Sequence, residues 1–410
     1  MDLQWQPVVN KGARIFVAGH QGLVGSAVIR ALSERGHSNL LTATRDRLDL
    51  CDQAAVEAFF KTEHPEIVVL CAARVGGIHA NSTRPAEFIR DNLLIQTHVI
   101  DAAYRHGTKK FLFLGSSCIY PRLARQPIAE SELLAGPLEK TNEAYAIAKI
   151  AGAKMCQAYR QQYDFDAIVA MPTNLFGDND DFSDTESHVL PALIARFHDA
   201  SERGAETVTV WGSGKPRREF LHADDCAAAI IHLLEHYSGE EPVNIGTGED
   251  LSIGELATLI AAATGFVGRI EFDVSKPDGT PRKLLDVSKM RALGWSPQIP
   301  LASGIARTCQ SYQRWMAGAR KKPRAARQQP PVRADDFWTS FETLESRHKS
   351  RLEAYDAARR ALDAVSGDDR EALIRTWTAF DVAVKELDEA VGEISAMEAG
   401  GLAALRTVSA

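Results

Sequence analysis

The sequence lacks the paired cysteines, the long apolar runs and the strong charge bias that mark several common classes of protein. Its six cysteines form no C-x-x-C pair, so we expect reduced thiols in a cytoplasmic protein rather than a disulfide framework. No apolar run reaches the length of a membrane-spanning helix, and the first residues contain no apolar stretch typical of a secretory leader. The formal net charge of −7 in 410 residues gives no field that would attract nucleic acid or an anionic membrane.

What the chain does contain is an alternation of short apolar strands with helical segments, and it is long enough for two or three domains. The predicted strands are 14–18, 40–44, 67–71, 110–114 and 167–171, and the helices between and after them include 26–34, 86–106 and 144–163. Such strands pair in parallel and are covered by helices on both faces. We therefore predict an α/β protein, with a Rossmann-type doubly wound parallel sheet over 12–177, to which 212–248 contribute in part. A smaller mixed α/β substrate domain is predicted mainly over 178–316.

A glycine loop joins the first predicted strand to a helix, which is the context that dinucleotide binding requires. The loop residues that we expect to contact a cofactor are Gly19, His20, Gln21, Gly22, Leu23, Val24 and Gly25. Gly19 permits a tight turn, Gly22 lets the backbone approach a pyrophosphate, and Gly25 lets the helix pack on the strand. The free N–H groups and the dipole of the helix then stabilise the phosphate charge.

The end of the second predicted strand distinguishes the two nicotinamide dinucleotides. An NAD-specific site has an Asp or Glu there to bind the ribose 2′-hydroxyl. This chain instead has Thr44 followed by Arg45, and a guanidinium suits a 2′-phosphate. We therefore predict NADP(H) in preference to NAD(H).

A serine, a tyrosine and a lysine form the candidate reaction centre. Tyr145 and Lys149 are four residues apart, which places them on one face of a helix, and Ser116 follows the predicted strand 110–114. An ammonium beside a phenol favours the phenolate, so we expect Tyr145 to titrate closer to neutrality than its ordinary pKa of about 10. These groups suit hydride transfer to a carbonyl, because the new alkoxide needs a proton and hydrogen-bond donors. The pair alone is common on amphipathic helices; the glycine loop and the serine favour catalysis.

The chain resembles the extended short-chain dehydrogenase/reductase family of nucleotide-sugar enzymes. The residues that carry this resemblance are Gly19–Gly25, Ser116, Tyr145, Lys149, Pro172–Gly177 and Arg218–Asp225. Further strings resemble the GDP-L-fucose synthases within that family: 115–121, 142–149, 171–175, 187–191 and 276–286. The resemblance covers roughly residues 12 to 316 and implies conversion of GDP-4-keto-6-deoxy-D-mannose to GDP-L-fucose with NADPH. It also implies a homodimer built on the two long helices.

The implied chemistry fits the side chains. The C4 ketone acidifies the protons on C3 and C5, and Ser116 and Tyr145 can hold its oxygen during both enolisation and reduction. For epimerisation, the resemblance points to Cys118 as the base and His188 as the acid. Taken alone, a single cysteine is more often a packed apolar side chain, and His188 could be a surface cap ahead of a helix.

The resemblance assigns the remaining site positions. Further cofactor contacts are implied for Leu114, Gly115, Ser116, Ser117, Tyr145, Lys149, Pro172, Thr173, Asn174, Leu175 and His188. The GDP-sugar is expected to contact Arg196, Trp211, Arg218 and Asp278. Guanidiniums bind a diphosphate bidentately and an indole can stack on a base, although Trp211 could instead be a core aromatic. No metal site is predicted.

The C-terminal part is an extension that this family does not normally carry. Residues 317–334 form a basic, Pro-rich linker, 335–397 are predicted to form an antiparallel helical hairpin from their heptad-like apolar pattern, and 398–410 are a tail. We expect the hairpin to dock on the enzyme or to mediate assembly, because two such helices cannot bury both apolar seams alone.

Two alternatives to the epimerase-reductase remain. The first is a nucleotide-sugar 4-epimerase that retains NAD, which Arg45, Cys118 and His188 oppose. The second is a non-catalytic scaffold on a reductase fold, which the presence of Ser116, Tyr145 and Lys149 opposes.

Overall fold

The computed structural model divides the chain into two units, Met1–Gly318 and Ala319–Ala410. The residues that it describes are 9–183, 187–276, 278–321, 349–351, 353–358, 360, 361, 379 and 382. In the second unit, residues 353–358 are helical. Most of the predicted linker and hairpin lies outside the described residues.

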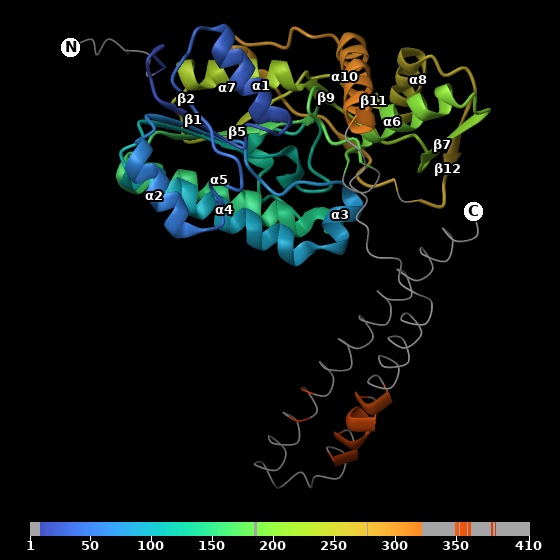
Figure 1. Cartoon of the computed structure of the whole chain (residues 1–410), viewed down its shortest axis with the longest axis horizontal. Coiled ribbons are helices and arrows are strands. Elements are labelled where there is room, and N and C mark those ends of the chain that lie inside the picture. The colour runs from blue at the N-terminus through green and yellow to red at the C-terminus, as the bar shows by residue number, and fades with distance from the viewer. Residues whose placement is uncertain are drawn as a thin grey trace. The chain divides into compact units, whose positions relative to one another are not determined.

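A six-stranded parallel sheet with the strand order β10-β5-β4-β3-β1-β2 forms the centre of the first unit (Figure 1). Its strands are β1 (Ile15–Ala18), β2 (Leu40–Leu41), β3 (Ile67–Leu70), β4 (Lys110–Leu114), β5 (Ala167–Pro172) and β10 (Val243–Ile245). The predicted doubly wound parallel sheet is confirmed. Strand β2 ends earlier than predicted, because the chain turns at Thr44, whose carbonyl accepts hydrogen bonds from the N–H groups of Arg47 and Leu48.

Helices cover both faces of this sheet (Figure 1). Helices α2 (Gln53–Glu63), α4 (Pro85–Arg105) and α5 (Glu143–Tyr163) lie on one face, and α1 (Leu23–Glu34) and α7 (Ala223–His236) on the other. Alternate strand residues serve the two faces: in β4, Phe111 and Phe113 pack in the first core, whereas Leu112 and Leu114 pack in the second. Burial on both sides explains the continuous apolar runs that marked the strands in the sequence.

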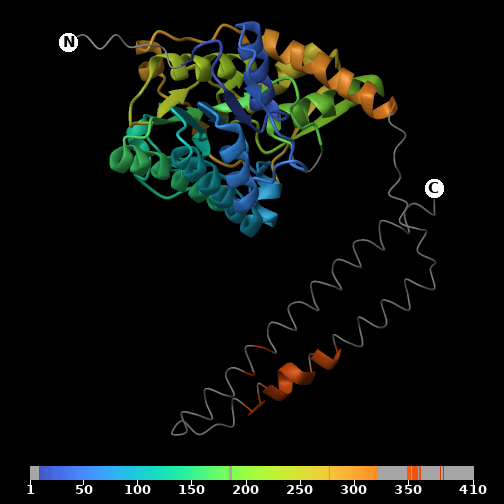
Figure 2. The ribbon, with the colours of Figure 1, turned by 60° about the vertical axis from the view of Figure 1, so that its left-hand side comes forward.

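A smaller layer lies beside the carboxyl ends of the strands. It contains helices α6 (Val189–Glu202), α8 (Ile253–Thr264) and α10 (Leu301–Lys321), together with β7 (Thr207–Trp211) paired in parallel with β12 (Arg269–Asp273) (Figure 1). Helix α10 is the orange helix of Figure 2. A third apolar core joins α6, α8 and α10. A capping box begins α8, since Ser252 and Glu255 each bind the other's backbone N–H.

Short elements connect these layers. Two small sheets pair β6 (Asn174–Phe176) with β9 (Phe220–His222) and order β11 (Leu251–Ser252), β8 (Arg217–Arg218) and β13 (Arg282–Lys283). The remaining helices are α3 (Ile78–Thr83), α9 (Ser288–Ala292) and the 3₁₀ turns η1 (Ser117–Ile119), η2 (Glu130–Glu132) and η3 (Lys140–Asn142).

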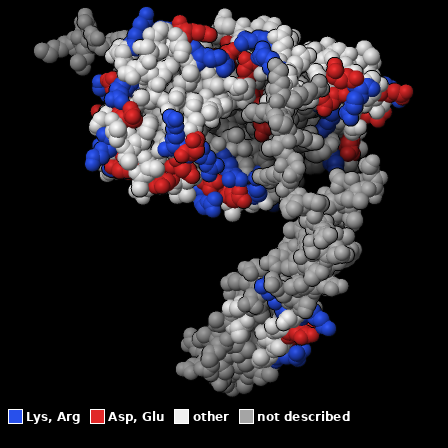
Figure 3. Space-filling view, viewed as in Figure 1, with Lys and Arg blue, Asp and Glu red and all other residues white. Residues whose placement is uncertain are grey.

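The surface and the helices bear on the classes considered above. Within the described ranges, no helix is long and apolar enough to cross a bilayer. Figure 3 shows lysines and arginines interspersed with aspartates and glutamates on the visible face of the first unit, without a broad basic field there. Among the same described residues, no group of three or more His, Cys, Asp or Glu side chains is placed to hold a metal ion.

Candidate active site

The glycine loop lies at the point where the sheet order reverses, between β1 and β3, which is where doubly wound sheets bind ligands. Gly19 has a φ of +85°, and a Cβ there would lie 2.8 Å from the Ala72 nitrogen. A Cβ on Gly25 would lie 2.1 Å from the Gly19 carbonyl oxygen, so its need for glycine arises inside the loop itself. Only glycine fits either position.

The start of helix α1 is open to a phosphate. Gly22 precedes the helix with no side-chain cap, and the nearest described atom to a Cβ there is the Gly19 oxygen at 3.5 Å. The buried Nδ1 atom of His20 has no hydrogen-bond partner among the described residues. Gln21 and Gly22 are exposed, so backbone N–H groups and the helix dipole face solvent at this end. The loop therefore fits a dinucleotide pyrophosphate.

Arg45 lies in the turn that follows β2. Its side chain is 78% exposed and its guanidinium is 3.8 Å from the Asp49 carboxylate, a weak surface pair. The guanidinium is therefore accessible to an anionic ligand.

The end of β4 and the start of α5 bring together the serine, the tyrosine and the lysine. The Ser116 hydroxyl accepts a hydrogen bond from the Cys118 N–H at 3.2 Å, which begins the 3₁₀ turn η1. The buried Lys149 ammonium donates to the Leu114 carbonyl oxygen at 2.8 Å and lies 4.7 Å from the centre of the Phe113 ring. Burial lowers the pKa of Lys149 to about 8. This lysine ties the helix to the strand end.

The expectation that Lys149 shifts Tyr145 toward neutrality is wrong for this structure. Burial, together with the negative charge that Cys118 carries when ionised, raises the pKa of Tyr145, although a hydrogen bond with Ser116 opposes the change. The Lys149 ammonium instead serves the Leu114 carbonyl. Tyr145 is therefore a neutral phenol, the form that can donate a proton.

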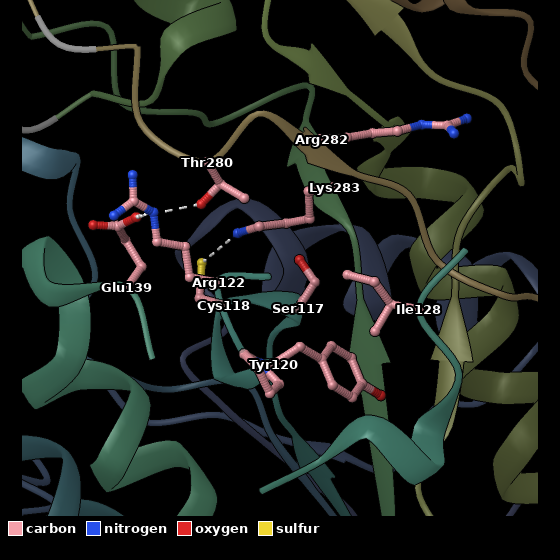
Figure 4. A pocket seen from close by; sticks show the side chains of 10 residues that line it. Ser117, Cys118, Tyr120, Arg122, Ile128, Glu139, Thr280, Arg282 and Lys283 are labelled. Atoms are coloured by element: carbon pink, nitrogen blue, oxygen red, sulfur yellow. Dashed lines mark hydrogen bonds and ion pairs between the residues drawn. The ribbon is translucent and has the colours of Figure 1, made fainter. Parts of the chain in front are cut away.

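Cys118 has a partner that the sequence did not reveal. The Lys283 ammonium, from β13, lies 3.5 Å from the Cys118 sulfur, and both line one pocket (Figure 4). Burial alone would raise the pKa of Cys118, but the charges of Lys283 and Arg218 and hydrogen bonds from Ser116 and Lys283 lower it overall. Lys283 belongs to the string 276–286, but no local pattern indicates that it meets residue 118.

His188 lies immediately before α6, at the position of the N-cap, and its side chain makes no capping hydrogen bond. The residue is exposed. Surrounding protein atoms nevertheless desolvate its ring, and this desolvation and then the positive charge of Lys283 lower the pKa of His188, while Asp181 opposes them. The thiol of Cys118 and the imidazole of His188 therefore lie within the influence of the same ammonium group.

Of the four positions expected to contact the GDP-sugar, Arg196 and Trp211 lie on the smaller layer, on α6 and β7. Arg218 lies on β8, and Asp278 lies on the segment between β12 and β13. Trp211 is 62% exposed, so it is not a core aromatic, and the Arg196 guanidinium lies 5.7 Å from the centre of its ring. Burial lowers the pKa of Arg218, although the negative charges of Cys118 and Asp278 act to raise it. The Asp278 carboxylate accepts hydrogen bonds from the N–H and hydroxyl of Ser213, so in this structure it holds a turn.

A buried carboxylate that the sequence did not single out joins three segments of the chain. Glu219 accepts hydrogen bonds from the N–H groups of Thr247, Gly248 and Leu285 at 2.6, 2.7 and 3.0 Å. Its backbone oxygen accepts from the side chain of Asn174, on the segment that follows β5. Glu219 thereby fixes the strand end at 172–175 relative to β13, which carries Lys283.

The chain is similar to known enzymes over most of the first unit. Residues 15–246 match the model of the NAD dependent epimerase/dehydratase family. The chain belongs to this family. Within it, a putative GDP-L-fucose synthase 2 of Arabidopsis thaliana is 59% identical over 305 residues, which are 74% of this chain and 93% of the relative. The GDP-L-fucose synthase of Escherichia coli (strain K12) is 54% identical over 308 residues, 73% of this chain and 96% of the relative.

Solved structures of the family agree with the fold. A GDP-L-fucose synthetase from Naegleria fowleri bound to NADP is 29% identical with a TM-score of 0.70. The alignment covers 76% of this chain and 98% of the Naegleria chain. A GDP-6-OMe-4-keto-L-xylo-heptose reductase from C. jejuni is 36% identical with a TM-score of 0.72. That alignment covers 75% of this chain and 99% of the reductase chain. This family member therefore shares its fold with proteins whose names describe reactions on GDP-sugars.

Proposed function

We propose that this enzyme converts GDP-4-keto-6-deoxy-D-mannose to GDP-L-fucose, by epimerisation at C3 and C5 followed by NADPH-dependent reduction at C4. Relatives at 54–59% identity carry the name GDP-L-fucose synthase. The single observation that carries the proposal is a cysteine thiol beside an ammonium, next to the Ser116 and Tyr145 hydroxyl groups. A 4-epimerase that retains NAD is not favoured, since it needs no such base.

The cofactor fits the glycine loop, and NADPH, when bound, supplies the hydride. The residues proposed to hold it are Gly19–Gly25, Arg45, Leu114–Ser117, Tyr145, Lys149, Pro172–Leu175 and His188. The α1 N-terminus stabilises the pyrophosphate charge, and the exposed Arg45 guanidinium suits the 2′-phosphate.

The reduction depends on donors around the ketone oxygen. The hydroxyl groups of Ser116 and Tyr145 bind the C4 oxygen, and the neutral phenol of Tyr145 gives its proton to the developing alkoxide. Lys149, bound to the Leu114 carbonyl, holds the tyrosine helix against the serine turn.

Epimerisation uses the same donors, because the enolate formed at C3 or C5 places its charge on the same oxygen. The Cys118 thiolate removes the carbon-bound proton, and the electron pair of that bond passes into the enolate. His188 in its protonated form returns a proton to the opposite face.

The rest of the substrate contacts the smaller layer. Arg196 and Arg218 bind the diphosphate, the exposed Trp211 ring stacks on the nucleoside, and Asp278 fixes the turn beside them. Residues 12–177, with part of 212–248, are proposed to form the cofactor half, and 178–316 mainly the substrate half. We also propose a cytoplasmic homodimer built on α4 and α5.

The test is incubation of the enzyme with the keto sugar nucleotide and NADPH, with the product stereochemistry read by NMR. We expect the L-fucose configuration and stoichiometric oxidation of NADPH. A product changed only at C4, with no net consumption of NADPH, contradicts the proposal. Parallel turnover with NADH and NADPH at equal concentration tests the role of Arg45, and a preference for NADH contradicts that role.

A further inference from the structure

The ammonium of Lys283 contacts the base of the proposed reaction. Its ammonium lies 3.5 Å from the Cys118 sulfur, although 165 residues separate them in the chain. Among the described residues, no carboxylate lies within ion-pair distance of Lys283. Figure 4 shows the lysine side chain pointing at the thiol. Its charge therefore acts on the sulfur without neutralisation by a direct acidic partner.

The other charged groups around the thiol are accounted for. Arg122 forms an ion pair with Glu139 at 3.1 Å on the wall of the same pocket. Arg282, next to Lys283, points away from the thiol and pairs with Asp250 at 2.5 Å (Figure 4). From the remaining elements, the Ser116 hydroxyl, the Tyr145 phenol and the Arg218 guanidinium also act on Cys118.

We propose that Lys283 is a positioning residue that stabilises the thiolate form of Cys118 and so prepares it to accept the substrate's proton. This inference rests on the proposed function and adds to it the group that activates the base. The Arg218 charge acts in the same direction as Lys283, but it makes no hydrogen bond to the sulfur among those that the described residues show.

The chemistry requires such a partner. An ordinary thiol is mostly protonated at neutral pH, and only the thiolate accepts a proton from carbon. Ionisation of Cys118 releases one proton to solvent and leaves a negative sulfur that attracts the ammonium. When the sulfur takes the C3 or C5 proton, it becomes a neutral thiol again, and the negative charge passes to the enolate oxygen beside Ser116 and Tyr145.

The fold holds Lys283 against the thiol from two sides. Strand β13 pairs in parallel with β8, so Lys283 is opposite Arg218. The next two residues are also fixed: the Leu284 N–H donates to the Gln126 side chain at 3.0 Å, and the Leu285 N–H donates to Glu219. The ammonium is therefore presented by a braced backbone rather than by a free surface side chain.

The test is the pH dependence of Cys118 alkylation by iodoacetamide in the ligand-free full-length enzyme. The rate at Cys118 is followed by peptide mass spectrometry, which separates it from the half-exposed Cys51 and Cys71. In Lys283→Met we expect the midpoint to rise by about one pH unit or more, which lowers the rate at neutral pH about tenfold. Lys283→Arg keeps the charge and should keep a midpoint below that of Lys283→Met.

Arg282→Met is the matched control, because it removes one positive charge from the same strand, and that charge points away from the thiol. It should leave the alkylation midpoint unchanged. Equal midpoints in the wild type and in Lys283→Met overturn the proposal, and so does an equal rise in Arg282→Met and Lys283→Met. If Lys283→Met does not fold, thiolate absorbance at 240 nm in the wild type, with Cys118→Ser as the blank, decides. A Cys118 midpoint at or above the ordinary thiol value overturns the proposal, and a lower one supports it.

The alkylation measurement needs no sugar nucleotide, so it separates this inference from the proposed function. A Lys283-dependent thiolate with a product other than GDP-L-fucose would refute the function alone. The correct product with a Cys118 midpoint that ignores Lys283 would refute this inference alone.

Discussion

At the scale of single residues, one ammonium group influences both the thiol and the imidazole. Lys283 lowers the pKa of Cys118 below its ordinary 9.0 and contributes to lowering that of His188 below its ordinary 6.5. A positive charge favours the thiolate and disfavours the imidazolium, because it attracts one and repels the other. The base gains from this arrangement, whereas the acid is protonated in only part of the molecules at neutral pH.

The first prediction concerns pH. The thiolate is gained as pH rises through the pKa of Cys118, and the imidazolium is lost as pH rises through that of His188. Epimerisation needs both forms at once, so its rate should give a bell-shaped pH profile. The alkaline limb follows the higher of the two pKa values and lies below 9.0, and the acid limb follows the lower one and lies below 6.5. Deuterium incorporation at C3 and C5 in D2O, read by NMR, gives the profile. An alkaline limb at or above the ordinary thiol value would contradict the assignment.

The second prediction separates the two reactions. Cys118→Ser replaces the base with a hydroxyl that does not ionise near neutrality, so we expect deuterium incorporation to fall at least about 100-fold. Hydride transfer should persist in part, because Ser116, Tyr145 and Lys149 are unchanged. NADPH oxidation with the keto sugar nucleotide measures it, and Tyr145→Phe is the reference variant, in which reduction should fall most. Equal loss of both reactions in Cys118→Ser would mean that the roles are not separable.

The sequence was enough to single out residues that belong to a local sequence pattern. Tyr145 and Lys149 lie four residues apart on α5, and Ser116 closely follows the apolar strand β4, so the local pattern was enough to single them out. Lys283 and Glu219 could not be found in this way, because their partners are 165 and 66 residues away. The direction of the Tyr145 pKa was also missed, since it depends on burial and on where the Lys149 ammonium donates.

At the scale of elements, the glycine loop has the tightest steric requirement. We predict that Gly25→Ala destabilises the protein by about 1–3 kcal/mol, because the new methyl group would overlap the Gly19 carbonyl oxygen. Affinity for NADPH should also fall at least about tenfold, since the loop must shift. Denaturant unfolding and fluorescence titration measure the two effects. Gly12→Ala is the control, because a Cβ there meets its nearest neighbour at 3.5 Å; equal effects of both variants would contradict the steric explanation.

Strands with strong apolar runs were predicted closely, and short strands were not. Strand β4 has the predicted bounds because a strand buried on both faces of the sheet has consecutive apolar residues. Strands β8 and β13 are two residues each and contain only charged side chains, so nothing local marks them. They form because Arg217 and Arg218 meet Arg282 and Lys283 through long-range pairing, and this pairing builds one wall of the site.

At the scale of the whole molecule, about three quarters of this chain is enough to align with nearly the full length of two relatives. These shares are 93% of the Arabidopsis thaliana relative and 96% of the Escherichia coli relative. We therefore predict that a chain ending after Lys321 retains at least about half of the specific activity of the full chain. Steady-state NADPH oxidation measures this, and size-exclusion chromatography compares the assembly of the two forms. Loss of activity in a folded truncated chain would show that the C-terminal unit takes part in catalysis.

The pairing of β13 with β8 also has a consequence for synthesis on the ribosome. A nascent chain that has emerged only as far as residue 270 already contains all six strands of the large sheet, but neither Lys283 nor the Leu285 amide. In such a chain Glu219 would be missing one hydrogen-bond donor and Cys118 its ammonium neighbour. The strands of the nucleotide half are thus complete early, while the thiol gains its ammonium partner only when translation of the first unit is almost finished.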